Sequence, residues 1–210
     1  MIVSRPLSTE HISVRDLSEQ DVPLMLDYWY RSPPGFVERM GVDLSKLPTE
    51  AEMARGTLQN ITDNCLLSTS KLHALAITCD GRTVGVHTLF PLIEGDHGIF
   101  HAHVWNPTFR NRGLGLRSYP KACQVFFERF DLKRILFKTP VQNIGAIRVK
   151  EKLGIPCIGE ELIDFGIIRA GTRAKVFELL SGESSIKSSA QSSQSPFKSS
   201  QRIDLQNILH

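Results

Sequence analysis

Hydrophobic residues along the first 180 positions recur with two different periods. Where they alternate with polar residues they predict β-strands, and where they return every three or four positions they predict helices. Strands are predicted over residues 11–16, 72–79, 84–92, 99–105, 135–138, 163–168 and 175–180. Helices are predicted over 18–32, 50–60, 118–130 and 143–154. The chain therefore reads β-α-α-β-β-β-α-β-α-β-β.

Proline and glycine set several of these boundaries. Pro33-Pro34-Gly35 ends the first helix, and Asp80-Gly81 is typical of a tight turn between two strands. Pro120 would cost about 3 kcal/mol in a helix interior. The third helix is therefore expected to be kinked in its first turns or to begin near Ser118.

The last thirty residues have a different composition. Half of residues 181–200 are serine, and large apolar side chains are sparse. Such a segment cannot bury enough surface to offset the entropy of ordering its backbone. The sequence predicts one domain over 1–180, followed by a serine-rich, disordered tail over 181–210.

Composition and charge exclude several classes of protein. The chain has 210 residues, 41% of them hydrophobic, and a net charge of +3 without a block of like charges, so neither nucleic acid nor a membrane surface is expected as a partner. No apolar run resembles a signal peptide or a membrane span, which predicts a cytoplasmic protein. The four cysteines show no paired spacing and are expected to be small buried residues, with no metal and no disulfide; they are Cys65, Cys79, Cys123 and Cys157.

A glycine turn lies between the strand that ends at Trp105 and the third helix. It reads Arg110-Asn111-Arg112-Gly113-Leu114-Gly115. Glycines let a ligand approach the backbone, and the helix start offers unpaired N–H groups and a partial positive charge. The turn is therefore a candidate pyrophosphate cradle. It lacks the Gly-Lys-Ser/Thr ending of a P-loop and the third glycine of the dinucleotide fingerprint.

Arg110, Gly113 and Gly115 resemble the Arg/Gln-x-x-Gly-x-Gly/Ala loop of the GNAT N-acetyltransferase superfamily. A second segment, from Asn143 to Gly154, resembles that superfamily's other cofactor segment in its Asn, Ala and closing Glu-Lys-Leu-Gly. The resemblance, nearest to the ribosomal-protein-modifying-like subgroup, implies the α/β (α+β) GNAT fold, a mixed, mostly antiparallel sheet with helices on both faces. It also implies acetyl-CoA as co-substrate, held by Val104, Trp105, Arg110, Asn111, Arg112, Gly113, Leu114, Gly115 and Asn143.

Two histidines are candidates for the base that frees the lone pair of an attacking amine. His101 and His103 are two residues apart on one strand, hence on one face, and neutral imidazole accepts a proton near pH 7. The resemblance places the base on this strand and favours His101. Glu160, Glu161 and Asp164 are alternative bases.

Lys150 stands where many superfamily members carry a tyrosine that protonates the departing thiolate. It could donate a proton, reach a cofactor phosphate, or extend its amine to solvent.

The resemblance also places the acceptor site along the connection between the first two helices. Tyr28, Tyr30, Arg31 and Phe36 are therefore candidate substrate contacts. The predicted function is acetyl transfer from acetyl-CoA to a primary amine, carried by a small molecule, protein or peptide. A non-catalytic acyl-CoA-binding module is the alternative, and a homodimer is possible.

Overall fold

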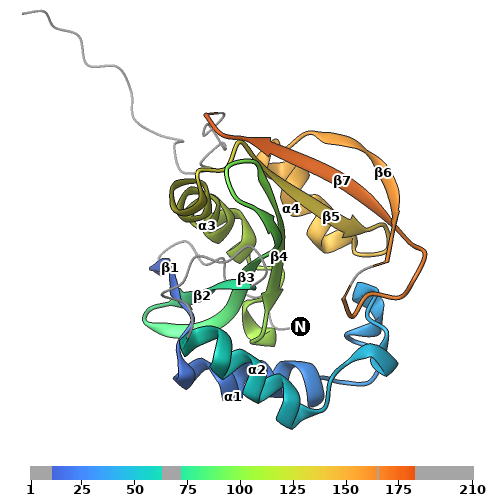
Figure 1. Ribbon diagram of the computed structural model, residues 1–210. Helices are drawn as coiled ribbons and strands as arrows, with labels where there is room; N and C mark the ends of the chain where they lie inside the picture. The colour runs from blue at the N-terminus through green and yellow to red at the C-terminus, as the bar shows by residue number, and fades with distance from the viewer. Residues whose placement is uncertain (1–10, 63–71, 165, 183–210) are drawn as a thin grey trace, which may run out of the picture.

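The computed structural model describes residues 11–62, 72–164 and 166–182. Seven strands form one sheet in the order β1-β2-β3-β4-β5-β7-β6 (Figure 1). The strands are β1 Ile12–Asp16, β2 His73–Cys79, β3 Arg82–Ile93, β4 His97–Val104, β5 Arg134–Pro140, β6 Cys157–Ile163 and β7 Thr172–Leu180. The α-helices are α1 Val22–Tyr30, α2 Glu50–Thr62, α3 Leu114–Phe130 and α4 Ile144–Leu153, and short 3-10 turns cover Glu19–Asp21, Glu38–Met40, Leu44–Lys46 and Pro107–Phe109.

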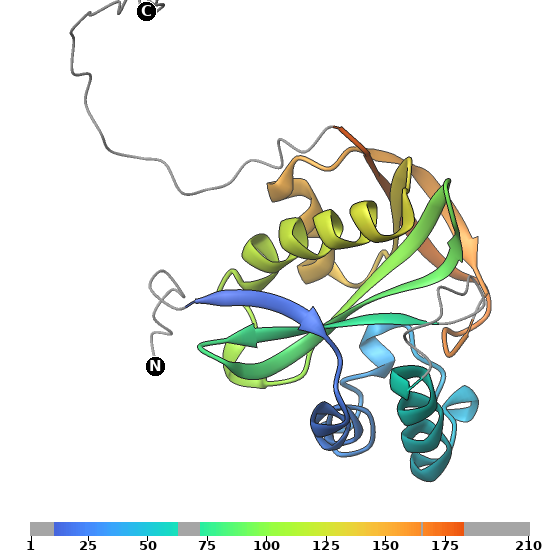
Figure 2. The same ribbon diagram turned by 60° about the vertical axis from the view of Figure 1, so that its left-hand side comes forward.

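Helices cover both faces of the sheet. Figure 2 shows α3 on one face and α1 with α2 on the other. The main core lies between the sheet and the pair α3 and α4, with Phe100, Phe126 and Phe137 at its centre. A second cluster packs α1 against β2 and β3 around Tyr28 and Trp105. This confirms the predicted element order and the mixed, mostly antiparallel sheet.

The sheet opens at its middle, where β4 and β5 meet as the only parallel pair among the strands of the described residues. β4 pairs with β5 only from His97↔Arg134 to Ile99↔Leu136. Beyond Ile99 the strands part, although β4 stays paired to β3 up to Val104. The edge of β4 from 100 to 103 thus faces a gap instead of a neighbouring strand, which leaves backbone groups there available to a ligand.

Three predictions from the sequence were wrong in detail. The strand expected over 163–168 lies instead at β6, an edge strand exposed on both faces whose sequence shows no clean alternation. Helix α3 begins at Leu114, which contradicts a start near Ser118, while a kink in its first turns stays a prediction; the helix contains Pro120 because burial of its apolar face outweighs the local cost of proline. Cys157 is exposed, whereas Cys79 and Cys123 are buried as expected. Cys65 and the tail from 183 onward lie outside the described residues.

Candidate active site

Gly113 forms the N-cap of α3 in a left-handed conformation, with φ +82°. Asn111, two residues earlier, also has a positive φ of +59°. These two positions turn the chain sharply after β4, so that the first N–H groups of α3 follow at once. A Cβ atom added at Gly113 would meet nothing within 4 Å. The space over this helix start is therefore open, as a site for a phosphate group requires.

Gly115 has a different reason to be glycine. A Cβ atom there would lie 3.1 and 3.2 Å from the two methyl groups of Val149 on α4. Gly115 thus allows α3 and α4 to pack closely within the first turn of α3. A bulky side chain at Gly115 would disturb this helix contact.

The two arginines of the motif bind backbone carbonyls within the protein, whereas a simple phosphate clamp would hold both guanidinium groups toward the ligand. Arg110 donates from Nε to Val104 O and from Nη2 to Trp105 O, both at 3.0 Å, and its guanidinium lies 4.0 Å from the ring centre of Phe36. It fixes the end of β4 to the glycine turn. Arg112 donates to Thr108 O at 3.2 Å. Their contact with the cofactor stays a prediction, as does that of Leu114, which is buried.

Val104 and Trp105 are also largely engaged within the protein. The N–H of Trp105 donates to Val84 O at 2.9 Å, and the carbonyls of both residues accept from Arg110. The indole of Trp105 is buried in the cluster beneath α1. Their predicted role in cofactor binding therefore rests on the strand edge that they terminate.

Asn143 is the N-cap of α4, accepting from Ala146 N–H at 3.2 Å. It also lines a small cavity of about 90 Å³ in the gap between β4 and β5. The other walls of this cavity include Phe100, Ala102, Tyr119, Thr139 and Lys150. The second motif therefore borders the gap, and α3, which follows the glycine turn, contributes Tyr119 to the same walls.

Lys150 is buried, with only 5% of its surface exposed. Its Nζ lies 3.4 Å from the hydroxyl of Tyr119, 5.3 Å from that ring's centre and 5.8 Å from the ring centre of Phe137. Burial lowers the pKa of Lys150 to about 7. Extension of the amine into solvent, one of the readings left open by the sequence, is excluded by this position.

Tyr119 was missed as a site residue by the sequence analysis. It is 5% exposed, and burial raises the pKa of its hydroxyl above the ordinary value. Its position four residues after Gly115 puts it on the same helix face as the glycine. This four-residue spacing from Gly115 is the feature of the sequence that could have identified Tyr119 as a site residue.

His101 and His103 lie on the opposite face of β4 from Phe100, toward α1. The Nε2 of His101 donates to Phe90 O at 2.8 Å, so the lone pair of the neutral ring is on Nδ1. Burial lowers the pKa of His101, partly countered by that hydrogen bond. His103 Nδ1 is hydrogen-bonded to Tyr28 Oη at 3.0 Å, and burial lowers its pKa to about 3. Both rings are therefore neutral near pH 7.

A larger cavity of about 490 Å³ lies on the α1 and α2 side of the sheet. It shares four wall residues with the small cavity, namely Met40, His101, His103 and Ile168. The histidines thus stand at the junction of the two spaces. The connection between α1 and α2 closes one side by pairing with the β6–β7 loop, through Asp43 N to Ile167 O and Arg169 N to Gly41 O, both 2.8 Å.

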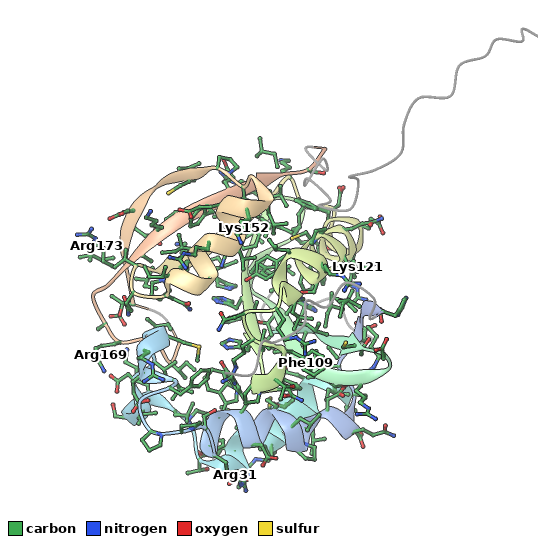
Figure 3. All side chains as sticks on the ribbon, turned by 180° about the vertical axis from the view of Figure 1, so that it is seen from behind. Arg31, Phe109, Lys121, Lys152, Arg169 and Arg173 are labelled. Carbon is green, nitrogen blue, oxygen red and sulfur yellow. The ribbon has the colours of Figure 1, made fainter. Side chains whose placement is uncertain are left out.

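Two of the four candidate substrate contacts are corrected by the structure. Tyr30 donates to Pro48 O at 2.6 Å and lines neither cavity. Arg31 is exposed, pairs with Glu50 at 2.8 Å, and projects outward from the helices (Figure 3). Tyr28 is buried and contacts the site through His103, while Phe36 lies under Arg110. Tyr28 and Tyr30 are two residues apart in α1 and therefore lie on nearly opposite faces of the helix. These two faces were not separated by the sequence analysis.

The alternative bases are held in ion pairs outside both cavities. Glu160 pairs with Arg173 at 2.9 Å, Glu161 with Lys138 at 2.6 Å and Asp164 with Lys46 at 3.1 Å. Figure 3 shows Arg173 at the outer edge of the sheet. The histidines are therefore the titratable groups best placed to act as base.

Residues 11–155 match the model of the acetyltransferase (GNAT) domain, and the chain belongs to this family. No curated protein matches the sequence. Within the described residues no three His, Cys, Asp or Glu side chains are grouped to hold a metal ion. None of the described helices is long and apolar enough to cross a membrane.

Solved structures of the same fold include three with different acceptors. The ribosomal L7/L12 α-N-protein acetyltransferase RimL has a TM-score of 0.63 at 15% identity, over 83% of this chain and 92% of its own. Aminoglycoside acetyltransferase AAC(6')-Ib with ribostamycin and coenzyme A has a TM-score of 0.65 at 14% identity, over 86% and 99%. Spermidine N-acetyltransferase from Vibrio cholerae with CoA and spermine has a TM-score of 0.63 at 16% identity, over 82% and 97%. At these identities the likeness establishes the fold alone.

Proposed function

We propose that this protein is an acetyl-CoA-dependent N-acetyltransferase in which a primary amine attacks the thioester directly. One observation carries the proposal. The two histidines lie where the narrow cavity between β4 and β5 meets the larger cavity beside α1 and α2. Two substrates that enter from opposite sides would therefore meet at the imidazole rings, which can accept and release protons.

The residues fit the co-substrate in two ways. The open helix start at Gly113 suits a pyrophosphate, and the unpaired edge of β4 beside the small cavity suits an amide-bearing arm. Gly113, Leu114 and the N–H groups that follow would hold the phosphates, and Asn143 would line the arm. Acetyl-CoA supplies the activated acyl group when bound.

His101 is assigned as the base. Its Nδ1 receives the proton that the amine loses as the C–N bond forms, because Nε2 is committed to Phe90 O. His103, held by Tyr28, completes the wall beside it. Base catalysis matters most for an amine of lysine type, whose pKa near 10.4 leaves it almost fully protonated at pH 7.

Lys150 is assigned as the acid. As the C–S bond breaks, the Nζ of Lys150 donates a proton to the sulfur. The hydroxyl of Tyr119 contacts the same ammonium group. A thiol has a pKa of about 8.5, so an ammonium with a pKa of about 7 is the stronger acid and the transfer is downhill. A solvent-exposed lysine would lack this advantage. Burial among Tyr119 and Phe137 thus gives Lys150 the chemistry of the missing tyrosine.

The experiment is an assay of thiol release from acetyl-CoA with primary amines, together with mass detection of the acetylated product. Turnover that depends on the amine supports the proposal. Tight CoA binding by calorimetry, with no transfer to any amine or peptide, would instead favour the non-catalytic acyl-CoA-binding module.

A further inference from the structure

The walls of the large cavity are mostly apolar. Side chains from both helices and from the sheet contribute, among them Met25, Trp29, Met53, Val86, Phe90 and Trp105. The volume of about 490 Å³ falls in the range of pockets that hold a small organic molecule. The body of a bound acceptor would therefore be surrounded mainly by hydrocarbon, aromatic rings and thioether sulfur.

Charge is sparse on these walls. Of the described residues that line the cavity, Glu52 is the sole carboxylate. Its Oε2 accepts from the N–H and the hydroxyl of Thr49, at 2.9 and 2.7 Å, so it caps the start of α2. Thr57 and Asn60 add uncharged polar groups on the same helix. A ligand with several cationic groups would find one carboxylate, already engaged.

The polar groups opposite α2 gather along one wall. Thr88 of β3 is directly across from His101 of β4, and His103 follows on the same face. This is the wall that borders the small cavity, where the acyl group is to be received. The arrangement suits a ligand with one polar end, placed at the histidines, and an apolar remainder.

On the basis of the proposed function, we infer that the acceptor is a small primary amine with a single cationic group on an aromatic or aliphatic body. A second ammonium group would have to leave water without a partner in the apolar part of the cavity, which is costly. Polyamines and aminoglycosides are thereby disfavoured as acceptors.

The apolar cavity also assists the chemistry. Desolvation disfavours the charged form of an amine and lowers its pKa. The ammonium of Lys150, which lines the neighbouring small cavity, shows the effect within this protein, since burial brings its pKa to about 7. A hydrophobic amine would therefore reach the histidines already closer to its nucleophilic form.

Hexylamine and hexamethylenediamine test the inference, because they differ mainly by a second terminal amine. Binding to the CoA-loaded protein is measured by calorimetry, and kcat/KM is measured with acetyl-CoA. We expect hexylamine and phenethylamine to exceed the diamine by at least about tenfold in both measurements. Equal or tighter binding of the diamine overturns the inference whether or not any amine is acetylated. If hexylamine binds preferentially without turnover, the preference of the cavity for a monoamine stands and the proposed function fails.

A peptide with an N-terminal phenylalanine serves as the third probe. Binding and turnover at least as good as those of phenethylamine would overturn the assignment to a small molecule. Much weaker values would support it, since the described walls offer few polar groups to pair with a peptide backbone.

Met53→Glu places a carboxylate on the α2 wall of the cavity. Leu58→Glu is the matched control, because Leu58 is on the same helix, is 39% exposed and does not line the cavity. Met53→Glu should shift the ratio of hexylamine to diamine kcat/KM toward the diamine by about tenfold, and Leu58→Glu should leave it unchanged. Equal shifts in the two variants, or none in a folded Met53→Glu protein, would contradict the inference.

Discussion

The Nζ atom of Lys150 lies 3.4 Å from the hydroxyl oxygen of Tyr119, and each residue is 5% exposed. The contact joins α4 to α3 directly beside the gap between β4 and β5. It places a lysine of lowered pKa and a phenol where the departing sulfur is expected. Burying this amine lowers the stability of the fold, and an apolar side chain at the same position would avoid that loss.

Replacement of Lys150 tests this assignment. Lys150→Met should lower kcat by about 10²- to 10⁴-fold, the range for loss of a general acid, with little change in CoA affinity. It should also raise the melting temperature, because a desolvated amine is replaced by an apolar side chain of similar length. Lys152→Met is the control, since Lys152 is exposed on the same helix (Figure 3). Full activity in Lys150→Met would remove the acid from this position.

The pH dependence of kcat should show the lysine directly. The acid must carry its proton, so kcat should fall as pH rises through about 7, where Lys150 loses it. In Lys150→Met this alkaline limb should disappear. A profile that is identical in the two proteins would show that another group sets it.

Loss of the base should remove the acidic limb. Burial lowers the pKa of His101, so the rise of kcat/KM with pH should be centred below the ordinary imidazole value of about 6.5. His101→Ala should reduce turnover of a lysine-like amine by about 10²- to 10⁴-fold, and less for an amine of lower pKa. His97→Ala is the control on the same strand, where the ring pairs with Asp96 away from both cavities. If His101→Ala retains activity and His103→Ala does not, the roles are exchanged.

Gly113→Val should abolish most CoA binding. The new side chain would fill the open space over the start of α3, and the positive φ would add about 1–2 kcal/mol of strain. Gly81→Val separates the two effects, since Gly81 has φ +77° and equally open surroundings in the turn between β2 and β3, outside both motifs. Calorimetry should show weakened CoA binding only for Gly113→Val. Unchanged affinity there would exclude the phosphate cradle.

Acid should destabilise the fold through His87. This ring is fully buried, its Nε2 lies 2.9 Å from Ser118 Oγ, and burial lowers its pKa to about 3. Between pH 6.5 and 3 the unfolded chain binds a proton that the folded chain does not, so stability falls as pH falls. The loss from this one group is about 2 kcal/mol at pH 5. Urea unfolding at pH 7 and pH 5 measures it, and His87→Gln should reduce the difference by about that amount, with His101 and His103 contributing the rest. An unchanged difference would show that His87 is not responsible.

The sequence by itself determined the order of elements and the cofactor motifs. Hydrophobic period and glycine spacing are local properties, and the two motifs lie on helix starts at Gly113 and Asn143 as expected. The histidine pair on β4 followed from the two-residue repeat of a strand. These features depend on neighbours in the chain, which explains why they were accessible.

Only the tertiary structure decided which side chains share a space. The departure of β4 from β5 after Ile99 is set by packing across the whole sheet, and it creates the gap beside Tyr119 and Lys150. The same packing turned Tyr30 and Arg31 outward and closed an apolar cavity from segments that are far apart in the sequence. A pKa displaced by burial, such as that of Lys150, depends on solvent exclusion by residues distant in sequence. No local pattern encodes that exclusion, because it arises only when both helical layers close over the sheet.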